Sequence, residues 1–205
     1  MPNHWFTADS HFGHGRIIQY CNRPFSCHEE MNEAIIQRFN EVLRPGDMLY
    51  HLGDVAWSSW PLEQLRRLNT KAIHLILGNH DKHKLPEYQK YCQWVGEYKE
   101  IHIAKGDVAT CLFHYAQRTW HSKGRGGFHL YGHSHGSLEP GLDRSMDVGV
   151  DTHNFYPYHW DEIVKELGRR PIFSSSTRQE FETGLGSAVA SAIADGTHVR
   201  DTGSE

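Results

Sequence analysis

The sequence predicts an α/β fold, because short apolar runs typical of strands alternate with amphipathic segments typical of helices. The chain has 205 residues, of which 38% are hydrophobic and 12% aromatic, so it has enough apolar side chain to bury a full core. Residues 1–171 carry this alternation and are predicted to form one domain. Residues 172–205 are rich in Ser, Gly and Ala and are predicted to be a tail or a loosely packed appendage.

The clearest predicted helix starts near a capping-box pattern, in which Glu29 follows Ser26 by three residues. Apolar residues then recur every four positions over 31–43, as one face of a helix requires, before Pro45-Gly46 ends the helix. Shorter helices are predicted at residues 17–20, 61–68 and 161–167.

At least six strands are predicted from short apolar runs. They cover residues 5–8, 48–52, 72–77, 108–113, 128–131 and 146–150. A further run at 101–104 precedes Lys105-Gly106-Asp107, which predicts a hairpin with the strand at 108–113.

The charge balance excludes several classes of partner. The 21 Lys and Arg residues against 25 Asp and Glu give a net charge of −4, and no basic run is present, so we expect no extended nucleic-acid surface. No apolar stretch reaches the length of about 18 residues that a membrane span needs, and residues 1–16 lack the features of a signal peptide. We therefore expect a cytoplasmic protein that does not bind membranes.

Residues able to bind metals follow five of the apolar runs, at the points where the chain leaves a predicted strand. They are Asp9 and His11, then Asp54, then Asn79, His80 and Asp81, then His114, and finally His133 and His135. Sites in open α/β sheets form outside the carboxyl ends of strands, so these side chains are predicted to share one cavity. This mixture of imidazole, carboxylate and amide ligands suits Zn, Mn, Fe or Ni better than calcium and suits a two-metal centre.

The spacing within these segments also suits ligand presentation. Residues two apart in an extended segment point to the same side, so the pairs Asp9/His11 and His133/His135 are each predicted to present two ligands together. Three of the segments contain a glycine that permits a sharp turn just before the key residues, at Gly53, Gly78 and Gly132.

In this order, the motifs closely resemble those of the calcineurin-like metallophosphoesterase superfamily over about residues 3–155. They are Asp9-x-His11, Gly53-Asp54, Gly78-Asn79-His80-Asp81, His114 and Gly132-His133-x-His135. A narrower resemblance to small bacterial and phage-type members is carried by Phe12-Gly13-His14, Asn22-Arg23-Pro24-Phe25, and Trp120 downstream of His114-Tyr115.

The resemblance implies an α/β/β/α sandwich, in which two mixed β-sheets pack face to face, helices flank them, and two divalent metals lie at the sheet ends. It implies one metal held by Asp9, His11, Asp54 and His135, and a second held by Asp54, Asn79, His114 and His133. Asp54 would bridge the two ions, for which manganese is the first choice. The pair would supply a hydroxide at neutral pH to attack the phosphorus of a small phosphoester.

The resemblance assigns catalysis to His80, as proton donor or stabiliser of the phosphoryl charge, and to Asp81, as the group that orients its imidazole. Arg118 and Arg23 are predicted to bind substrate, since a guanidinium clamps phosphate oxygens well. His14 lies in the same loop as His11 and is predicted to reach substrate. Asp147 is predicted to orient a metal-bound histidine through the free nitrogen of its ring.

Protein phosphatases of this superfamily follow Gly-Asp with a second Asp and an Arg, whereas Gly53-Asp54 is followed here by Val55-Ala56-Trp57-Ser58. This departure favours a phosphodiesterase acting on a small or nucleotide-like substrate. Two alternatives stay open, a phosphomonoesterase of the same fold and a non-catalytic metal-binding scaffold. A metal-buffering protein is disfavoured, because the ligands follow separate strands instead of forming one flexible tract.

Overall fold

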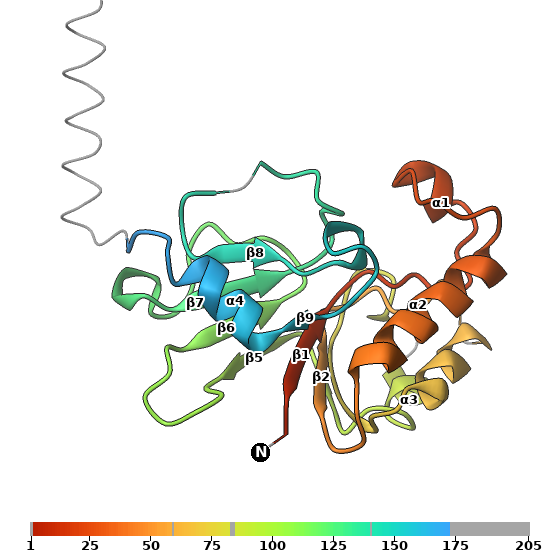
Figure 1. The fold of residues 1–205 in the computed structure, drawn as a ribbon, viewed down its shortest axis with the longest axis horizontal. Helices are drawn as coiled ribbons and strands as arrows, with labels where there is room; N and C mark the ends of the chain where they lie inside the picture. Colours follow the sequence, from red (N-terminus) through yellow and green to blue (C-terminus); the bar gives the residue numbers. More distant parts are fainter. Residues whose placement is uncertain (1, 59, 83–84, 140, 173–205) are drawn as a thin grey trace, which may run out of the picture.

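The computed structural model describes residues 2–58, 60–82, 85–139 and 141–172 (Figure 1). The predicted appendage lies outside these ranges except for Ile172. Within the described residues, one of the two sheets has five strands. The strand order is β4-β3-β2-β1-β9. Its members are β1 (His4–Thr7), β2 (Met48–His51), β3 (Ala72–Ile76), β4 (Trp94–Gly96) and β9 (Tyr158–His159). β1 to β4 run parallel and β9 is an antiparallel edge strand, so the carboxyl ends of β1, β2 and β3 lie together.

A second sheet has four strands in the order β5-β6-β7-β8. They are β5 (Tyr98–Ile101), β6 (Thr110–Phe113), β7 (Phe128–Tyr131) and β8 (Ser145–Asp147). β5 pairs antiparallel with β6, so the predicted hairpin is confirmed, but its first strand ends at Ile101 instead of spanning 101–104. The reason is local, because the Asp107 carboxylate accepts a hydrogen bond from the backbone N–H of Ala104 (2.9 Å) and closes a turn inside the loop.

Helices cover the face of the five-stranded sheet that lies away from the second sheet. They are α1 (Ile17–Tyr20), α2 (His28–Val42), the 3₁₀ helix Trp60–Arg67 and α3 (Leu85–Tyr88). The last helix, α4 (Trp160–Leu167), packs instead against the core between the two sheets. Figure 1 shows α2 and α3 on the side of β1 and β2 away from β6 and β7. The predicted capping box is wrong, since Cys27 is the N-cap of α2 and Ser26 donates to Glu30, not Glu29.

The apolar core is divided between the two faces of the five-stranded sheet. Side chains alternate along β2, so Leu49 packs with the α2 residues and Tyr50 packs with residues of the second sheet. The core between the sheets also takes three side chains of α4, namely Trp160, Ile163 and Leu167. The two face-to-face mixed sheets with flanking helices that the motifs imply are thus confirmed.

The outer face of the second sheet is covered by residues 114–127, a segment that contains the short 3₁₀ helix Lys123–Arg125. Trp120 of this segment is buried and lies over His129 of β7, with ring centroids 5.4 Å apart. Its indole N–H donates to the carbonyl of Gly127 (2.9 Å). Among the described helices, none is long and apolar enough to span a lipid bilayer.

Candidate metal centre and active site

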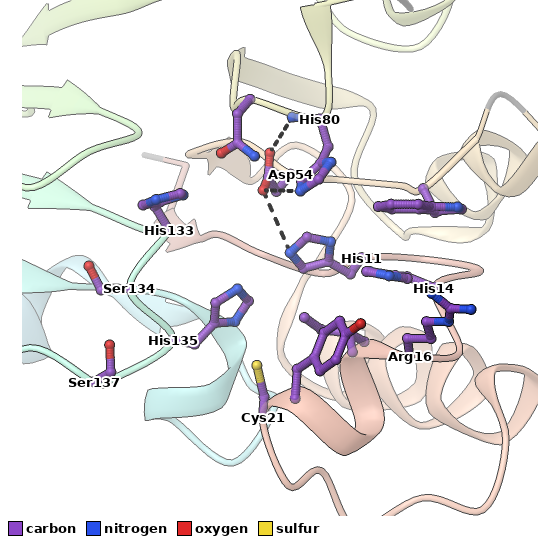
Figure 2. A pocket seen from close by; sticks show the side chains of 14 residues that line it. His11, His14, Arg16, Cys21, Asp54, His80, His133, Ser134, His135 and Ser137 are labelled. Atoms are coloured by element: carbon purple, nitrogen blue, oxygen red, sulfur yellow. Dashed lines mark hydrogen bonds and ion pairs between the residues drawn. The ribbon is translucent and has the colours of Figure 1, made fainter.

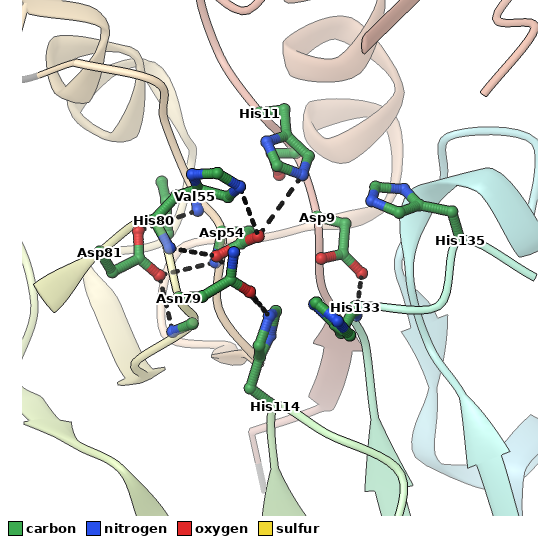
Figure 3. Close-up of polar contacts among 12 residues, drawn as sticks. Asp9, His11, Asp54, Val55, Asn79, His80, Asp81, His114, His133 and His135 are labelled. Carbon is green, nitrogen blue, oxygen red and sulfur yellow. Dashed lines mark hydrogen bonds and ion pairs between the residues drawn. The ribbon is translucent and has the colours of Figure 1, made fainter. Parts of the chain in front are cut away.

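The predicted ligands converge at the carboxyl ends of strands from both sheets (Figure 3). Asp9 and His11 follow β1, Asp54 follows β2 and Asn79 follows β3, all in the five-stranded sheet. The second sheet contributes His114 after β6, and His133 and His135 after β7. The site therefore lies across the ends of the two sheets, as the placement of these residues after apolar runs predicts.

The backbone at five of these ligands is left-handed, a conformation that costs energy for any residue except glycine. Asp9, His11, Asp54, His133 and His135 have φ values of 58°, 49°, 55°, 66° and 48°. Hydrogen bonds hold the turns, since the N–H of Asp9 donates to Gly53 O (2.9 Å) and that of His11 to Asp54 O (3.0 Å).

The ligand atoms of these residues fall into two groups. One group contains Asp9, His11 and His135, and a second contains Asp54, His114 and His133, with the ligand atoms of each group within 4.8 Å of one another. The prediction that His133 and His135 present their rings together is wrong, because the two residues fall in different groups, whereas Asp9 and His11, whose backbone is also left-handed, share one.

Asp54 belongs to the second group and also faces the first. Its Oδ2 is 3.6 Å from His11 Nε2 and its Oδ1 is 3.6 Å from His114 Nε2. The amide oxygen of Asn79 lies 3.1 Å from the same His114 nitrogen. All seven predicted metal ligands are therefore brought together, with one carboxylate facing both groups.

Several buried polar atoms of the centre have no hydrogen-bond partner within the described part of the chain. They are Asp9 Oδ1 and both ring nitrogens of His11. Burying such atoms without a partner is costly, and a divalent cation would satisfy the Asp9 oxygen and one of the two His11 nitrogens. Imidazole, carboxylate and amide donors are also the ligand types that bind Mn, Fe or Zn. The residues present therefore fit divalent metal ions.

The protonation states of the ligands respond to burial. Burial raises the pKa of Asp9 well above its usual value, and burial together with the charge of Arg23 lowers the pKa of His11 well below its usual value. The pKa of His133 is lowered by burial and by His114. Histidines held neutral are in the form that binds metal, and a cation would stabilise the Asp9 carboxylate.

The remaining two histidines are oriented through their second ring nitrogen. The Nδ1–H of His114 donates to Leu52 O (2.7 Å), which leaves Nε2 as the ligand atom. His135 Nδ1 lies 2.7 Å from Asp151 Oδ2. Burial would lower the pKa of His135, but hydrogen bonds with Asp151 and Cys21 raise it to about 10, so a metal would displace a proton from this ring.

The carboxylate that orients His135 is that of Asp151. The prediction that Asp147 has this role is wrong. Asp147 accepts hydrogen bonds from two backbone amides instead, those of Gly136 (3.0 Å) and Gly149 (2.7 Å). Its oxygens therefore stabilise the turns around β8. The next acidic residue along the chain, Asp151, contacts His135 instead.

Arg23 is buried beneath the centre instead of lining the cavity. Its Nε and Nη2 each lie 2.7 Å from an oxygen of Asp151. The same guanidinium donates to the carbonyls of Asp9 (2.8 Å) and Ser10 (3.2 Å). With its donors engaged in this way, Arg23 positions the ligand loops, which corrects its expected contact with substrate.

Asp81 is fully buried and is likewise a positioning residue. Its carboxylate accepts hydrogen bonds from the backbone N–H groups of Asp54 (2.6 Å), Gly78 (2.9 Å) and Val55 (3.2 Å), and from the hydroxyl of Tyr88. These bonds fix the loops after β2 and β3. The structure thus corrects the expectation that Asp81 orients the imidazole of His80.

His80 lies at the edge of the metal centre, with 36% of its side chain exposed. Its backbone N–H donates to Asp54 Oδ1 (3.0 Å), and its Nε2 lies 3.8 Å from Asp54 Oδ2. Its ring faces a cavity of about 540 Å³, which Figure 2 shows with the ligands His11, Asp54, His133 and His135 on its wall.

Of the residues predicted to bind substrate, His14 lines this cavity. Burial and the nearby His80 lower its pKa to about 4. Arg118 is exposed and, like Arg23, is not part of the lining, whereas Arg16 is the one Arg or Lys among the described residues that line the cavity.

Comparison with known proteins gives the family. The model of the calcineurin-like phosphoesterase family matches residues 4–178. The chain belongs to this family. It is accordingly a metal-dependent phosphoesterase, and the motifs that indicated the family are those that form the centre.

Relatives of this family member come from varied sources. An uncharacterised protein of Methanocaldococcus jannaschii, MJ1445, is 33% identical over 182 residues, which cover 84% of this chain and 95% of that protein. The gene 66 protein of Mycobacterium phage L5 is 32% identical over 85 residues, or 40% of this chain and 41% of that protein. The crystal structure of AQ665, a protein of unknown function from Aquifex aeolicus, shares the fold with a TM-score of 0.67 and 24% identity, covering 81% of this chain and all of that one.

Sequence reasoning missed three residues of the site, Asp151, Arg16 and Trp57. No local signal marks Asp151 as a partner of Arg23, because the two lie 128 positions apart. Arg16 and Trp57 follow motif residues closely, His14 and Asp54 respectively, so their nearness to the ligand segments was an available signal.

Proposed function

We propose that this phosphoesterase is a phosphodiesterase with a dinuclear metal centre that hydrolyses a small, nucleotide-like phosphodiester. The observation that carries the proposal is the position of Asp54, whose two carboxylate oxygens face the two ligand groups. A bridging carboxylate between two sets of histidines is the arrangement that a two-metal site needs.

Asp9, His11, Asp54 and His135 would hold one ion, and Asp54, Asn79, His114 and His133 the other. When bound, the ions polarise the phosphoryl oxygens and lower the pKa of the attacking water. His114 and His135 are pre-oriented for this by Leu52 O and Asp151, which hold their Nδ1 atoms.

His80 is the proton donor in this proposal. Its backbone bond to Asp54 fixes it beside the centre, while its partly exposed ring reaches the cavity. From there the ring can donate a hydrogen bond or a proton to the leaving oxygen as the bond to phosphorus breaks. Asp81 supports this step indirectly, by holding the loops that carry Asp54 and Gly78.

Beyond the metal ions, the side chains of the cavity offer little positive charge, which favours a diester over a monoester. A phosphate monoester carries about −1.5 to −2 charge at neutral pH, whereas a diester carries one negative charge. Among the described residues that line the cavity, Arg16 is the one Arg or Lys side chain, and Arg23 is already paired with Asp151. A volume of about 540 Å³ also suits a small ligand.

The test compares hydrolysis of bis(4-nitrophenyl) phosphate and 4-nitrophenyl phosphate by the manganese-loaded protein. We expect the diester to be the better substrate. His80→Ala should lower kcat for the diester by about 100-fold or more, the usual contribution of a general acid. Asp54→Asn should abolish turnover, and His102→Ala, which changes an exposed histidine outside the cavity, should not affect it.

Preferential hydrolysis of the monoester would contradict the proposal and favour a phosphomonoesterase. A protein that binds two ions but cleaves neither ester would instead be a scaffold.

A further inference from the structure

An exposed indole stands beside the metal centre. Trp57 is 51% exposed, although large aromatic side chains are normally mostly buried. Its place is nevertheless fixed, because its backbone N–H donates to Phe12 O (3.0 Å) and its ring stacks on that of His14, with centroids 3.9 Å apart and planes 12° apart. The same indole lies 5.1 Å from the ring of His80.

The hollow at the metal centre continues past this stacked pair. His14, Arg16 and Trp57 line the cavity of about 540 Å³ that contains the ligands, and they also line an adjoining cavity of about 390 Å³. Gln19 belongs to the wall of the second cavity, and Tyr20, 69% exposed, belongs to the wall of the first. A phosphoester bound at the metals therefore has room for a flat group along Trp57.

We propose that Trp57 and Tyr20 form a base-stacking subsite, so that the substrate is a phosphodiester of a nucleoside. The inference rests on the proposed function and specifies the group attached to the phosphorus. Aromatic side chains next to a backbone-binding site bind nucleobases by stacking, with little dependence on which base is present.

The rim of the subsite matches the polar edge of a base better than it matches a purely apolar group. Arg16 and Gln19 offer side-chain donors, and both are exposed. Indole and base present flat π faces to each other, while the guanidinium and amide remain available to the carbonyl groups of the base. With a simple alkyl or aryl ester, these exposed donors would contact water instead of the ligand.

Two diesters with the same leaving group separate base recognition from turnover. They are thymidine 5′-(4-nitrophenyl phosphate) and methyl 4-nitrophenyl phosphate, tested with the manganese-loaded full chain. We expect the wild type to prefer the thymidine ester, and Trp57→Ala to lower the ratio of the two kcat/KM values by about tenfold. Trp57→Phe should keep most of the preference, and Leu142→Ala, an exposed apolar residue outside both cavities, should keep all of it.

The outcomes are distinct. An unchanged ratio in Trp57→Ala, or an equal loss with both esters, would overturn the subsite. If the wild type cleaves neither ester, the proposed function fails, and the subsite is then judged by binding alone. Titration with thymidine 5′-monophosphate should quench tryptophan fluorescence in the wild type and not in Trp57→Ala, whereas identical titrations of the two would overturn it.

Discussion

His135 shows how the centre controls a single ligand. A histidine ring can bind metal through either nitrogen, and the hydrogen bond at Nδ1 decides which one faces the ion. Here Asp151 takes Nδ1, and Arg23 holds both oxygens of Asp151 while also donating to the carbonyl of Asp9. One buried guanidinium therefore connects the ligand loops of both sheets.

Asp151→Asn tests this connection. The amide keeps the shape of the carboxylate but loses its charge, so His135 is less well oriented and Arg23 loses its ion pair. We expect the affinity for Mn²⁺ to fall by about 10- to 100-fold, as measured by calorimetric titration. Asp161→Asn, the same change at an exposed position on α4, should leave the affinity as in the wild type. An unchanged affinity in Asp151→Asn would mean that His135 needs no brace.

His129 is a buried histidine with a structural role. Its Nε2 accepts the backbone N–H of Gln117 (3.0 Å) and its Nδ1 contacts Cys111 O (3.2 Å), so it attaches the segment 114–127 to β7. Burial lowers its pKa to about 4, against a reference value of 6.5, so the folded protein holds the ring neutral.

Protonation of His129 should therefore destabilise the fold in acid. The unfolded chain takes up this proton as pH falls below about 6.5, and the folded protein does so only below about 4, so stability falls across this window and then levels off. The full loss amounts to about 3 kcal/mol. In urea unfolding from pH 7 to pH 4.5, His129→Gln should lose about 2 kcal/mol less than the wild type. Above pH 7.5, the free energies of unfolding of the two proteins should change with pH in the same way. If they also change in the same way between pH 7 and pH 4.5, the assignment is wrong.

At the scale of elements, the loops that follow the strands are packed without spare room. The Asp54 carboxylate lies against the backbone of Gly78, and a Cβ built on Gly78 would overlap Asp54 Oδ1 and approach Asp54 N to 2.6 Å. At Gly132, a Cβ would lie 2.5 Å from Ala8 Cβ and 2.7 Å from Asp9 Oδ2. Glycine is needed at both places for close approach to a ligand carboxylate.

Gly78→Ala should displace Asp54 and damage both metal groups. We expect the free energy of unfolding to fall by about 3 kcal/mol and the manganese content to drop below one ion per chain. Gly15→Ala is the matched control for folding, since its Cβ would make only an ordinary contact of 3.7 Å with His28. Equal stability and metal content in the two variants would show that the loops after β2 and β3 can move apart.

The elements that sequence could predict are those governed by local patterns. Apolar runs placed β1, β2, β3, β6 and β7, and the polar residues just after them gave the ligand set. The division of His133 and His135 between two groups was beyond the spacing argument, which assumes an extended backbone that neither residue has. The motif resemblance, which carries such long-range information, did assign them to different metals.

Contacts between segments that are distant in the sequence could not be predicted from local patterns either. Arg23 was predicted to bind phosphate because its type and position suited that role, yet the fold brings Asp151 to it from 128 residues away. Asp81 was predicted to act on its neighbour His80, but it meets the backbone of Asp54, 27 positions earlier. A residue type fixes which bonds are possible, and the tertiary structure selects among them.

At the scale of the whole molecule, the centre joins the two sheets. The Asp9 carboxylate, after β1, accepts the N–H of His133, after β7 (2.8 Å), and Ala8 bridges to Gly149. Each ligand group draws residues from both sheets, His135 in the first group and His114 and His133 in the second. Bound ions would thus link the two sheets in addition to taking part in catalysis.

Metal removal should therefore lower the stability of the whole fold. A ligand that binds only the folded state stabilises it by about 2.7 kcal/mol per site at a free concentration 100 times its Kd. Chelator-treated protein should unfold at a lower temperature in circular dichroism, and added Mn²⁺ should restore the Tm in a concentration-dependent way. Asp54→Asn, which weakens both groups, should show a much smaller recovery. A Tm indifferent to Mn²⁺ would exclude this role for the ions.

Anomalous diffraction at the manganese edge, from crystals of the Mn²⁺-loaded protein, would show whether two ions share Asp54. We expect two peaks of comparable occupancy, one coordinated by Asp9, His11 and His135 and the other by Asn79, His114 and His133, with Asp54 between them. A single peak at full manganese loading, or two peaks of which one lies away from Asp54, would contradict this expectation.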